Sequence, residues 1–199
     1  MSMIRYVVAA ICASSLASAA SAQTATVAPA PAAVTPRPAP LPPATIDIGR
    51  IAPDFTIAWA DSAGVRDTPM TLSSLRGKVV VLAFYPADRT SGCTAELTKF
   101  RDEYSRMFGS NTVVIPISVD SIASHVSWAG EMKFPFALAS DPQLTVADQY
   151  GSHSAGRSFA SRTVFVIGKD GTILWRNLKF GALNEGAYAE LSAEVAKAQ

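Results

Sequence analysis

The 199-residue chain has few of the side chains that build redox or metal centres: two cysteines, Cys12 and Cys93, and two histidines, His125 and His153. Without a Cys-x-x-Cys pair, it lacks the motif of a dithiol oxidoreductase and the cysteine pair of a zinc site. The two histidines are isolated in the sequence, and we expect both at the surface. We therefore expect neither a cysteine–histidine pair for hydrolysis nor a metal or other cofactor.

The sequence also lacks an excess of charge, with 17 Lys and Arg residues against 16 Asp and Glu. Arg5 and Arg37 are the only charged residues before Asp47, so the remainder carries 15 basic and 16 acidic residues. This balance does not indicate nucleic acid or an anionic membrane as a partner, and a small neutral substrate fits it.

The N-terminus contains a strongly apolar run, but this run is too short to span a membrane comfortably. Residues 1–22 have the pattern of a secretory signal peptide: Arg5 supplies the positive charge, and Ala20-Ser21-Ala22 matches a cleavage site. Cleavage would make Gln23 the first residue and leave Cys93 as the single thiol. We expect a periplasmic or secreted protein without stable membrane insertion; an uncleaved anchor is the alternative.

Residues 23–46 are mostly Ala, Pro and Thr, a composition that cannot bury a core. This segment is expected to be a disordered linker, and both a spacer role and no specific role remain open. Residues 47–199 are long enough for one domain with a full core. Strands and helices alternate along it before a hairpin and a final helix, which indicates an α/β layered domain.

Apolar runs and turn residues predict where the elements lie. The expected strands are 55–59, 78–85, 112–119, 134–139, 162–167 and 172–176, and the expected helices are 93–108, 122–132, one after Asp141-Pro142 and one after Asn184. Pro116 lies inside the third of these strands and predicts a bulge or a strand end, because proline cannot donate to a sheet ladder.

Cys93 lies where a buried strand gives way to a helix. The apolar run Lys78–Tyr85 is ended by Pro86, a short polar turn follows, and Cys93 opens the helical pattern. A thiol at a helix start meets free backbone N–H groups and the positive end of the helix dipole, which both favour thiolate. This loop position argues against a cysteine that merely fills a core.

Pro86, Thr90 and Cys93 form the pattern P-x-x-x-T-x-x-C, which resembles the active-site motif of the peroxiredoxins. Six segments resemble that family in its order: IGRIAPDFTI, LRGKVVVLAFYP, SGCTAELTKFRDEY, ISVDSIASHVSWA, FPFALASDPQLTVADQYG and SRTVFVIGKDGTI. The chain is most similar to the bacterioferritin-comigratory-protein branch of these AhpC/TSA-type redoxins. The resemblance implies a thioredoxin-like fold, a mixed sheet flanked by helices, and thiol-dependent reduction of hydrogen peroxide and organic hydroperoxides.

The resemblance also implies roles for individual side chains. Cys93 would attack the peroxide and become a sulfenic acid. Thr90 would place its hydroxyl beside the sulfur or the peroxide, and Pro86 would exclude water. Arg162 stands at the strand start where the family has its arginine, and would stabilise the thiolate and the developing oxyanion. Glu96 either orients Arg162 or is a first-turn acid favourable to the helix dipole.

The chain departs from this branch at Thr98, where many members have a second cysteine five residues after the first. An internal disulfide is then excluded in the mature chain, and we expect an external reductant, a small thiol or a thioredoxin-like protein. A monomer or dimer is expected. The alternatives are a monothiol thioredoxin-like thiol-disulfide oxidoreductase and a non-catalytic redoxin-fold binding module, in which Cys93 would be dispensable.

Overall fold

The computed structural model describes residues 46–199, so the predicted signal peptide and nearly all of the Pro/Ala-rich segment lie outside the described residues. Within residues 46–199, no helix combines the length and hydropathy that crossing a membrane requires.

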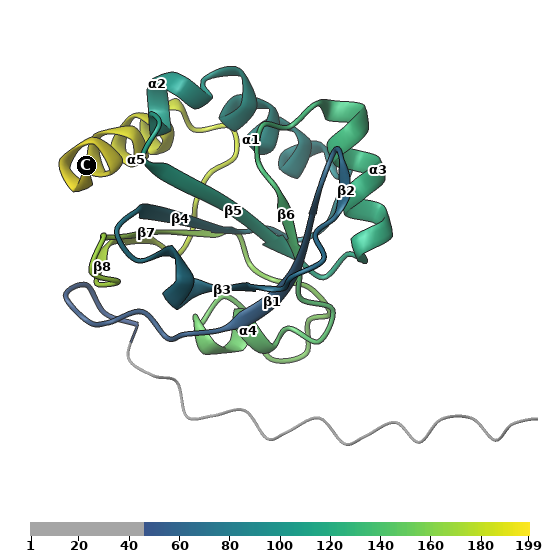
Figure 1. The fold of residues 1–199 in the computed structure, drawn as a ribbon, viewed down its shortest axis with the longest axis horizontal. Coiled ribbons are helices and arrows are strands. Elements are labelled where there is room, and N and C mark those ends of the chain that lie inside the picture. Colours follow the sequence, from purple (N-terminus) through teal and green to yellow (C-terminus); the bar gives the residue numbers. More distant parts are fainter. Residues whose placement is uncertain (1–45) are drawn as a thin grey trace, which may run out of the picture. The chain divides into compact units, whose positions relative to one another are not determined.

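A mixed β-sheet lies at the centre of this domain (Figure 1). Its strands follow one another across the sheet in the order β2, β1, β6, β5, β4, β7, β8, with β3 paired to β1. Strands β4, β5 and β6 are parallel, whereas β1, β7 and β8 each run antiparallel to a neighbour. The bounds are β1 Thr56–Asp61, β2 Gly64–Val65, β3 Met70–Thr71, β4 Val79–Phe84, β5 Thr112–Ser118, β6 Leu138–Ser140, β7 Thr163–Ile167 and β8 Ile173–Asn177.

Helices cover both faces of the sheet (Figure 1), which confirms the predicted thioredoxin-like α/β class. One buried cluster includes side chains of α1, α2, α3 and α5, and the other includes those of the 3-10 helix η1 and α4. The bounds are η1 Leu72–Leu75, α1 Ser91–Asp102, α2 Tyr104–Phe108, α3 Ile122–Met132, α4 Thr145–Gln149 and α5 Glu185–Ala198.

Strand β4 is buried on both faces, as its unbroken apolar sequence predicts. Because side chains alternate along a strand, Val81 and Ala83 enter the first cluster while Leu82 and Phe84 enter the second. The strand thus joins the two halves of the core and holds its C-terminal end, where the loop to Cys93 begins, in a fixed place.

The predicted helix 93–108 is two helices in the structure. It begins two residues earlier, at Ser91, and Glu103 separates α1 from α2 with a backbone φ of −111° and ψ of 17°. The change of direction lets Tyr104 stack on Phe136 while Phe108 meets Phe100 edge to face. Periodicity alone missed the break because both pieces present apolar residues to the same core.

The prediction that Pro116 would cause a bulge or end the strand is wrong. Pro116 pairs with Ala83 in an unbroken register between β5 and β4. The Ile117 carbonyl accepts from the Tyr85 N–H on the β4 side, so the preceding residue directs its nitrogen to the opposite side. There β5 meets β6 only from Ile117 onward, so the missing N–H of proline leaves no ladder bond unmade.

Two predicted boundaries around β6 also shift. The apolar run 134–139 forms a strand only from Leu138, because Phe134 and Phe136 are buried by stacking on each other rather than by strand pairing. Helix α4 starts at Thr145, later than expected, yet the Asp141 carboxylate still accepts the N–H groups of Thr145 and Ala147.

Phe165 of β7 provides a test of the second cluster, because its ring contacts Phe84 and Tyr150 at centroid distances of 6.0 and 5.3 Å. We expect Phe165→Ala to lower the free energy of unfolding in urea by about 3–5 kcal/mol. Leu183→Ala is the matched control, since Leu183 is 84% exposed and its loss should change stability by less than about 0.5 kcal/mol. Equal effects of the two substitutions would contradict this account of the core.

Candidate active site

Cys93 is the third residue of α1 and is fully buried. Thr90 is the residue that precedes the helix, and its extended backbone places its carbonyl to accept the Thr94 N–H at 2.8 Å. Cys93 therefore lies in the first turn, where backbone N–H groups lack helical partners and the helix dipole is positive. The predicted junction of strand, loop and helix at Cys93 is confirmed.

Sheet pairing brings Arg162 to this cysteine. Strand β7 is antiparallel to β4 and pairs Thr163 with Phe84, so Arg162 lies beside the end of β4 where the cysteine loop starts. The Arg162 Nη2 donates to Cys93 Sγ at 3.3 Å, across 69 positions of sequence. A guanidinium at this distance stabilises negative charge on sulfur and on an oxygen that reacts there.

Glu96 holds the other side of the same guanidinium. Its carboxylate forms an ion pair with Arg162 Nη1, its side chain is fully buried, and its second oxygen, Oε1, has no hydrogen-bond partner. Burial raises the pKa of Glu96 to about 7, and the nearby Arg162 charge opposes that rise. Of the two roles left open for Glu96, orientation of Arg162 fits this structure, because no acid lies in the first turn of α1.

Arg162 itself stays charged in this setting. Burial lowers its pKa, but the Glu96 carboxylate and the Cys93 sulfur outweigh that effect and raise the pKa above the ordinary value for arginine. The site thus contains one permanent cation between a thiol and a carboxyl group whose charge changes near neutral pH.

The two remaining predicted residues lie on the loop before the helix. Pro86 is partly buried, directly after β4. Thr90 is exposed, and its hydroxyl donates to the Ala87 carbonyl at 3.1 Å. In this structure Thr90 therefore fixes the turn of the loop, and no contact between its hydroxyl and the sulfur is present among the described residues.

Gly92 is a site residue that the sequence reasoning missed. A Cβ atom built there would lie 3.1 Å from Arg162 Nη2, tighter than an ordinary contact. Glycine thus lets the guanidinium lie against the first helical turn and reach Cys93. The only sequence signal is the glycine immediately before the cysteine, and hydrophobic periodicity gives no role for such a glycine.

The expectation that both histidines lie at the surface is wrong. His125 is fully buried and contacts Asp88 and the Ala139 carbonyl, and the His153 side chain is only 9% exposed beside Asp148. His125 shares one helix face with the buried Trp128 and Ala129, three and four residues later. That helical spacing is the signal that could have placed it in the core.

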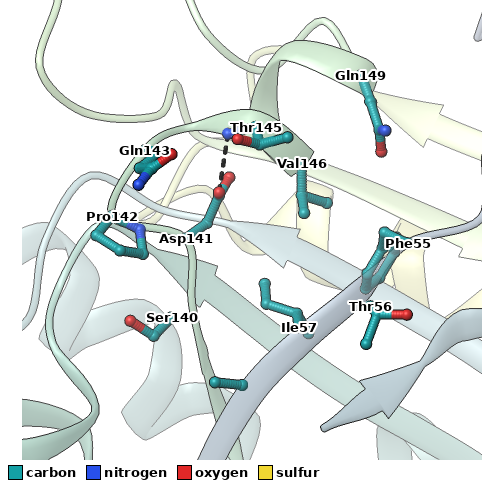
Figure 2. Close-up of a pocket in the computed structure, with 11 residues that line it drawn as sticks. Phe55, Thr56, Ile57, Ser140, Asp141, Pro142, Gln143, Thr145, Val146 and Gln149 are labelled. Carbon is teal, nitrogen blue, oxygen red and sulfur yellow. Dashed lines mark hydrogen bonds between the residues drawn. The ribbon is translucent and has the colours of Figure 1, made fainter. Parts of the chain in front are cut away.

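A separate cavity of about 340 Å³ lies between β1 and the segment that leads into α4, and Figure 2 shows its lining. It contains none of the predicted site residues. Its acid, Asp141, already accepts the Thr145 N–H at 2.8 Å, drawn as a dashed line. Among residues 46–199, no group of three or more His, Cys, Asp or Glu side chains is placed to hold a metal ion.

Comparison with known proteins agrees with this geometry. A model of the AhpC/TSA family matches residues 48–176, well over half of the chain. The putative peroxiredoxin bcp of Coxiella burnetii is 36% identical over 143 residues, which cover 68% of this chain and 91% of that protein. These relatives do not favour the monothiol oxidoreductase or the binding module.

Solved structures show the same fold. Peroxidoxin BcpB of Mycobacterium tuberculosis is 30% identical with a TM-score of 0.64, over 76% of this chain and 97% of that one. The bacterioferritin comigratory protein of Xanthomonas campestris, whose structures were described in connection with alkyl peroxide reduction, is 24% identical with a TM-score of 0.61, over 73% and 92% of the two chains. The chain described here belongs to the AhpC/TSA family and is a peroxiredoxin, a thiol-dependent peroxidase.

Proposed function

We propose that Cys93 is the peroxide-reducing thiol of this enzyme, and the contact of Arg162 with Sγ at 3.3 Å carries the proposal. The thiolate attacks one peroxide oxygen, a sulfur–oxygen bond forms, and the oxygen–oxygen bond breaks. The sulfur becomes a sulfenic acid, while the second oxygen leaves as hydroxide or alkoxide and takes up a proton. Arg162 stabilises the thiolate before the step and the leaving oxygen during it.

Full burial of Cys93 supports this role for the arginine. Water is excluded from the sulfur, and the charge of Arg162 therefore acts through a medium of lower polarity than solvent. We assign Pro86 to the wall of the site and Thr90 to its loop. Glu96 is a positioning residue, because its carboxylate touches Arg162 rather than the sulfur.

We infer that an external thiol returns Cys93 to its reduced state. The second cysteine of many relatives is replaced by Thr98, and Cys93 is the single cysteine of residues 46–199. One thiol condenses with the sulfenic acid and releases water, and a second thiol frees Cys93 as a disulfide forms between the two reductants. A disulfide between two copies would need both buried sulfurs to meet, which the position of Cys93 disfavours.

The alkyl peroxide reduction named for the Xanthomonas protein supports organic hydroperoxides as substrates here, beside hydrogen peroxide. For the N-terminus we propose cleavage of a signal peptide after Ala22 and a periplasmic or secreted enzyme, with residues 23–46 as its linker. The intact mass of protein exported by a bacterial host tests this. Retention of residues 1–22 would indicate a membrane anchor instead.

Cys93→Ser should abolish peroxide reduction without loss of the folded state, because no other thiol lies in the described domain. The measurement is single-turnover peroxide consumption, with trapping by dimedone and intact mass. The wild type should give one dimedone adduct on Cys93 and the variant none. Remaining turnover in the variant would refute the assignment, and rapid, complete formation of a disulfide-linked dimer would refute the external reductant.

Arg162→Ala should slow oxidation of Cys93 by at least about tenfold, because a charge-assisted contact to a developing anion is lost. The rate of Cys93 oxidation by hydrogen peroxide is the measurement. Arg157→Ala removes an exposed arginine from the loop before β7 and should react like the wild type. An unchanged rate in Arg162→Ala would remove Arg162 from the site.

Glu96→Gln should change how stability depends on pH. Glu96 has its ordinary pKa of 4.5 in the unfolded chain, whereas burial raises its pKa to about 7 in the folded protein. Between these values the unfolded state binds fewer protons, so wild-type stability falls as pH rises. Relative to Glu96→Gln, the wild type should lose about 1–3 kcal/mol of unfolding free energy between pH 4.5 and pH 8 in urea titrations. A difference in unfolding free energy between the two proteins that stays constant with pH would contradict the raised pKa of Glu96.

A further inference from the structure

A fully buried histidine–aspartate pair connects α3 to the loop that precedes Cys93. His125 Nδ1 lies 3.0 Å from Asp88 Oδ2, and the two side chains are 0% and 2% exposed. His125 Nε2 lies 3.2 Å from the Ala139 carbonyl of β6. The reaction described above uses neither residue, although Asp88 lies five positions before Cys93.

The hydrogen bonds around this pair determine its charges. The Ala139 carbonyl can only accept, so His125 Nε2 carries a proton. Asp88 accepts from the Tyr85 hydroxyl through Oδ1 at 2.8 Å and from the Ser124 hydroxyl through Oδ2 at 2.6 Å. Ser124 in turn accepts from Arg89 at 3.2 Å, so its own hydrogen is free to point to Asp88.

With both of its oxygens accepting, Asp88 is ionised, and His125 Nδ1 must donate to it. Burial raises the pKa of Asp88, but the hydrogen bonds and charge of His125, Ser124 and Tyr85 outweigh this and lower it overall. His125 thus donates through both ring nitrogens and is an imidazolium, sealed from solvent beside a carboxylate.

The same loop is held at two further points. The Asp88 N–H donates to Asp120 at 2.8 Å, and the Arg89 guanidinium reaches Glu131 at 2.8 Å on the outer side of α3. Arg89 has a φ of +61°, a left-handed conformation that is unfavourable for a residue with a side chain. A loop in this conformation needs outside contacts to persist. Thr90, the next residue, immediately precedes the helix of Cys93.

We propose that protonated His125 is a positioning residue that holds the cysteine loop in its reactive conformation through its hydrogen bond to Asp88. The inference rests on Cys93 as the peroxide-reducing thiol. A neutral His125 would have a single N–H and would leave either the Asp88 carboxylate or the Ala139 carbonyl without its donor. The other ionisable groups that face the pair are Tyr85 and Asp120, with Arg89 and Glu131 outside, and none of them replaces the lost donor.

The charge of His125 can be measured on the wild-type protein, independently of activity. The chain has two histidines, so His153→Gln assigns the imidazole signals in a nitrogen-15 NMR spectrum. We expect His125 to show two protonated ring nitrogens at pH 7. An unprotonated ring nitrogen at that pH would overturn the proposal, whatever the peroxidase rates are.

The positioning role can be tested with His125→Gln, Asp88→Asn and the double variant. Each single variant should slow peroxide oxidation of Cys93 by about five- to tenfold, and the double variant should be no slower than the slower single one. In the same variants, the rate at which iodoacetamide alkylates Cys93, corrected for the thiolate fraction, should fall less than the rate of peroxide reduction. His153→Gln, which removes the other histidine beside an aspartate, should retain the wild-type rate.

The comparison of the two reagents separates positioning from a general loss of structure. An equal slowing of peroxide oxidation and of alkylation by iodoacetamide, or additive losses in the double variant, would overturn the proposal. Wild-type rates in the His125 and Asp88 variants would also overturn the proposal, provided that Cys93→Ser is inactive. An active Cys93→Ser would instead refute the proposed function.

Discussion

The antiparallel pairing of β4 with β7 is the constraint on which the active site depends. The loop to Cys93 leaves the end of β4, and Arg162 immediately precedes β7, so one register sets their separation. A shift of one residue would turn the side chains of β7 to the opposite face of the sheet. Burial of both faces of β4 and β7 opposes such a shift, and the core thereby holds Arg162 against the sulfur.

Much of this arrangement could be predicted from local sequence, because its signals are local. The apolar run that ends at Pro86 and the helical spacing after Cys93 placed the cysteine correctly. Arg162 was identified only through family resemblance, since no local rule joins residues 69 positions apart. Helical spacing could have placed His125 in the core, but its partner Asp88 comes from another segment and leaves no local signal. Pro116 was misread because sequence does not show which neighbouring strand its nitrogen faces.

Two buried carboxyl groups near Cys93, Glu96 in its helix and Asp88 in the loop before it, respond differently to burial. Glu96 has one cationic partner and an oxygen without a hydrogen bond, so burial favours its neutral form. Asp88 is less deeply buried and has donors on both oxygens, which outweigh burial and lower its pKa. The contrast shows that depth and the number of donors together decide whether a carboxyl group keeps its charge in this protein.

The complete burial of Cys93 has a consequence for which molecules can meet it. The two oxygens of the peroxide proposed to react here are small enough to reach the sulfur through minor movements of side chains, whereas a protein thiol would need the first turn of α1 to open. The two halves of the proposed cycle would then use different conformations of the same helix. Reagents larger than the peroxide group would react more slowly, and the time that the helix spends open would set how long an oxidised sulfur waits for its reductant.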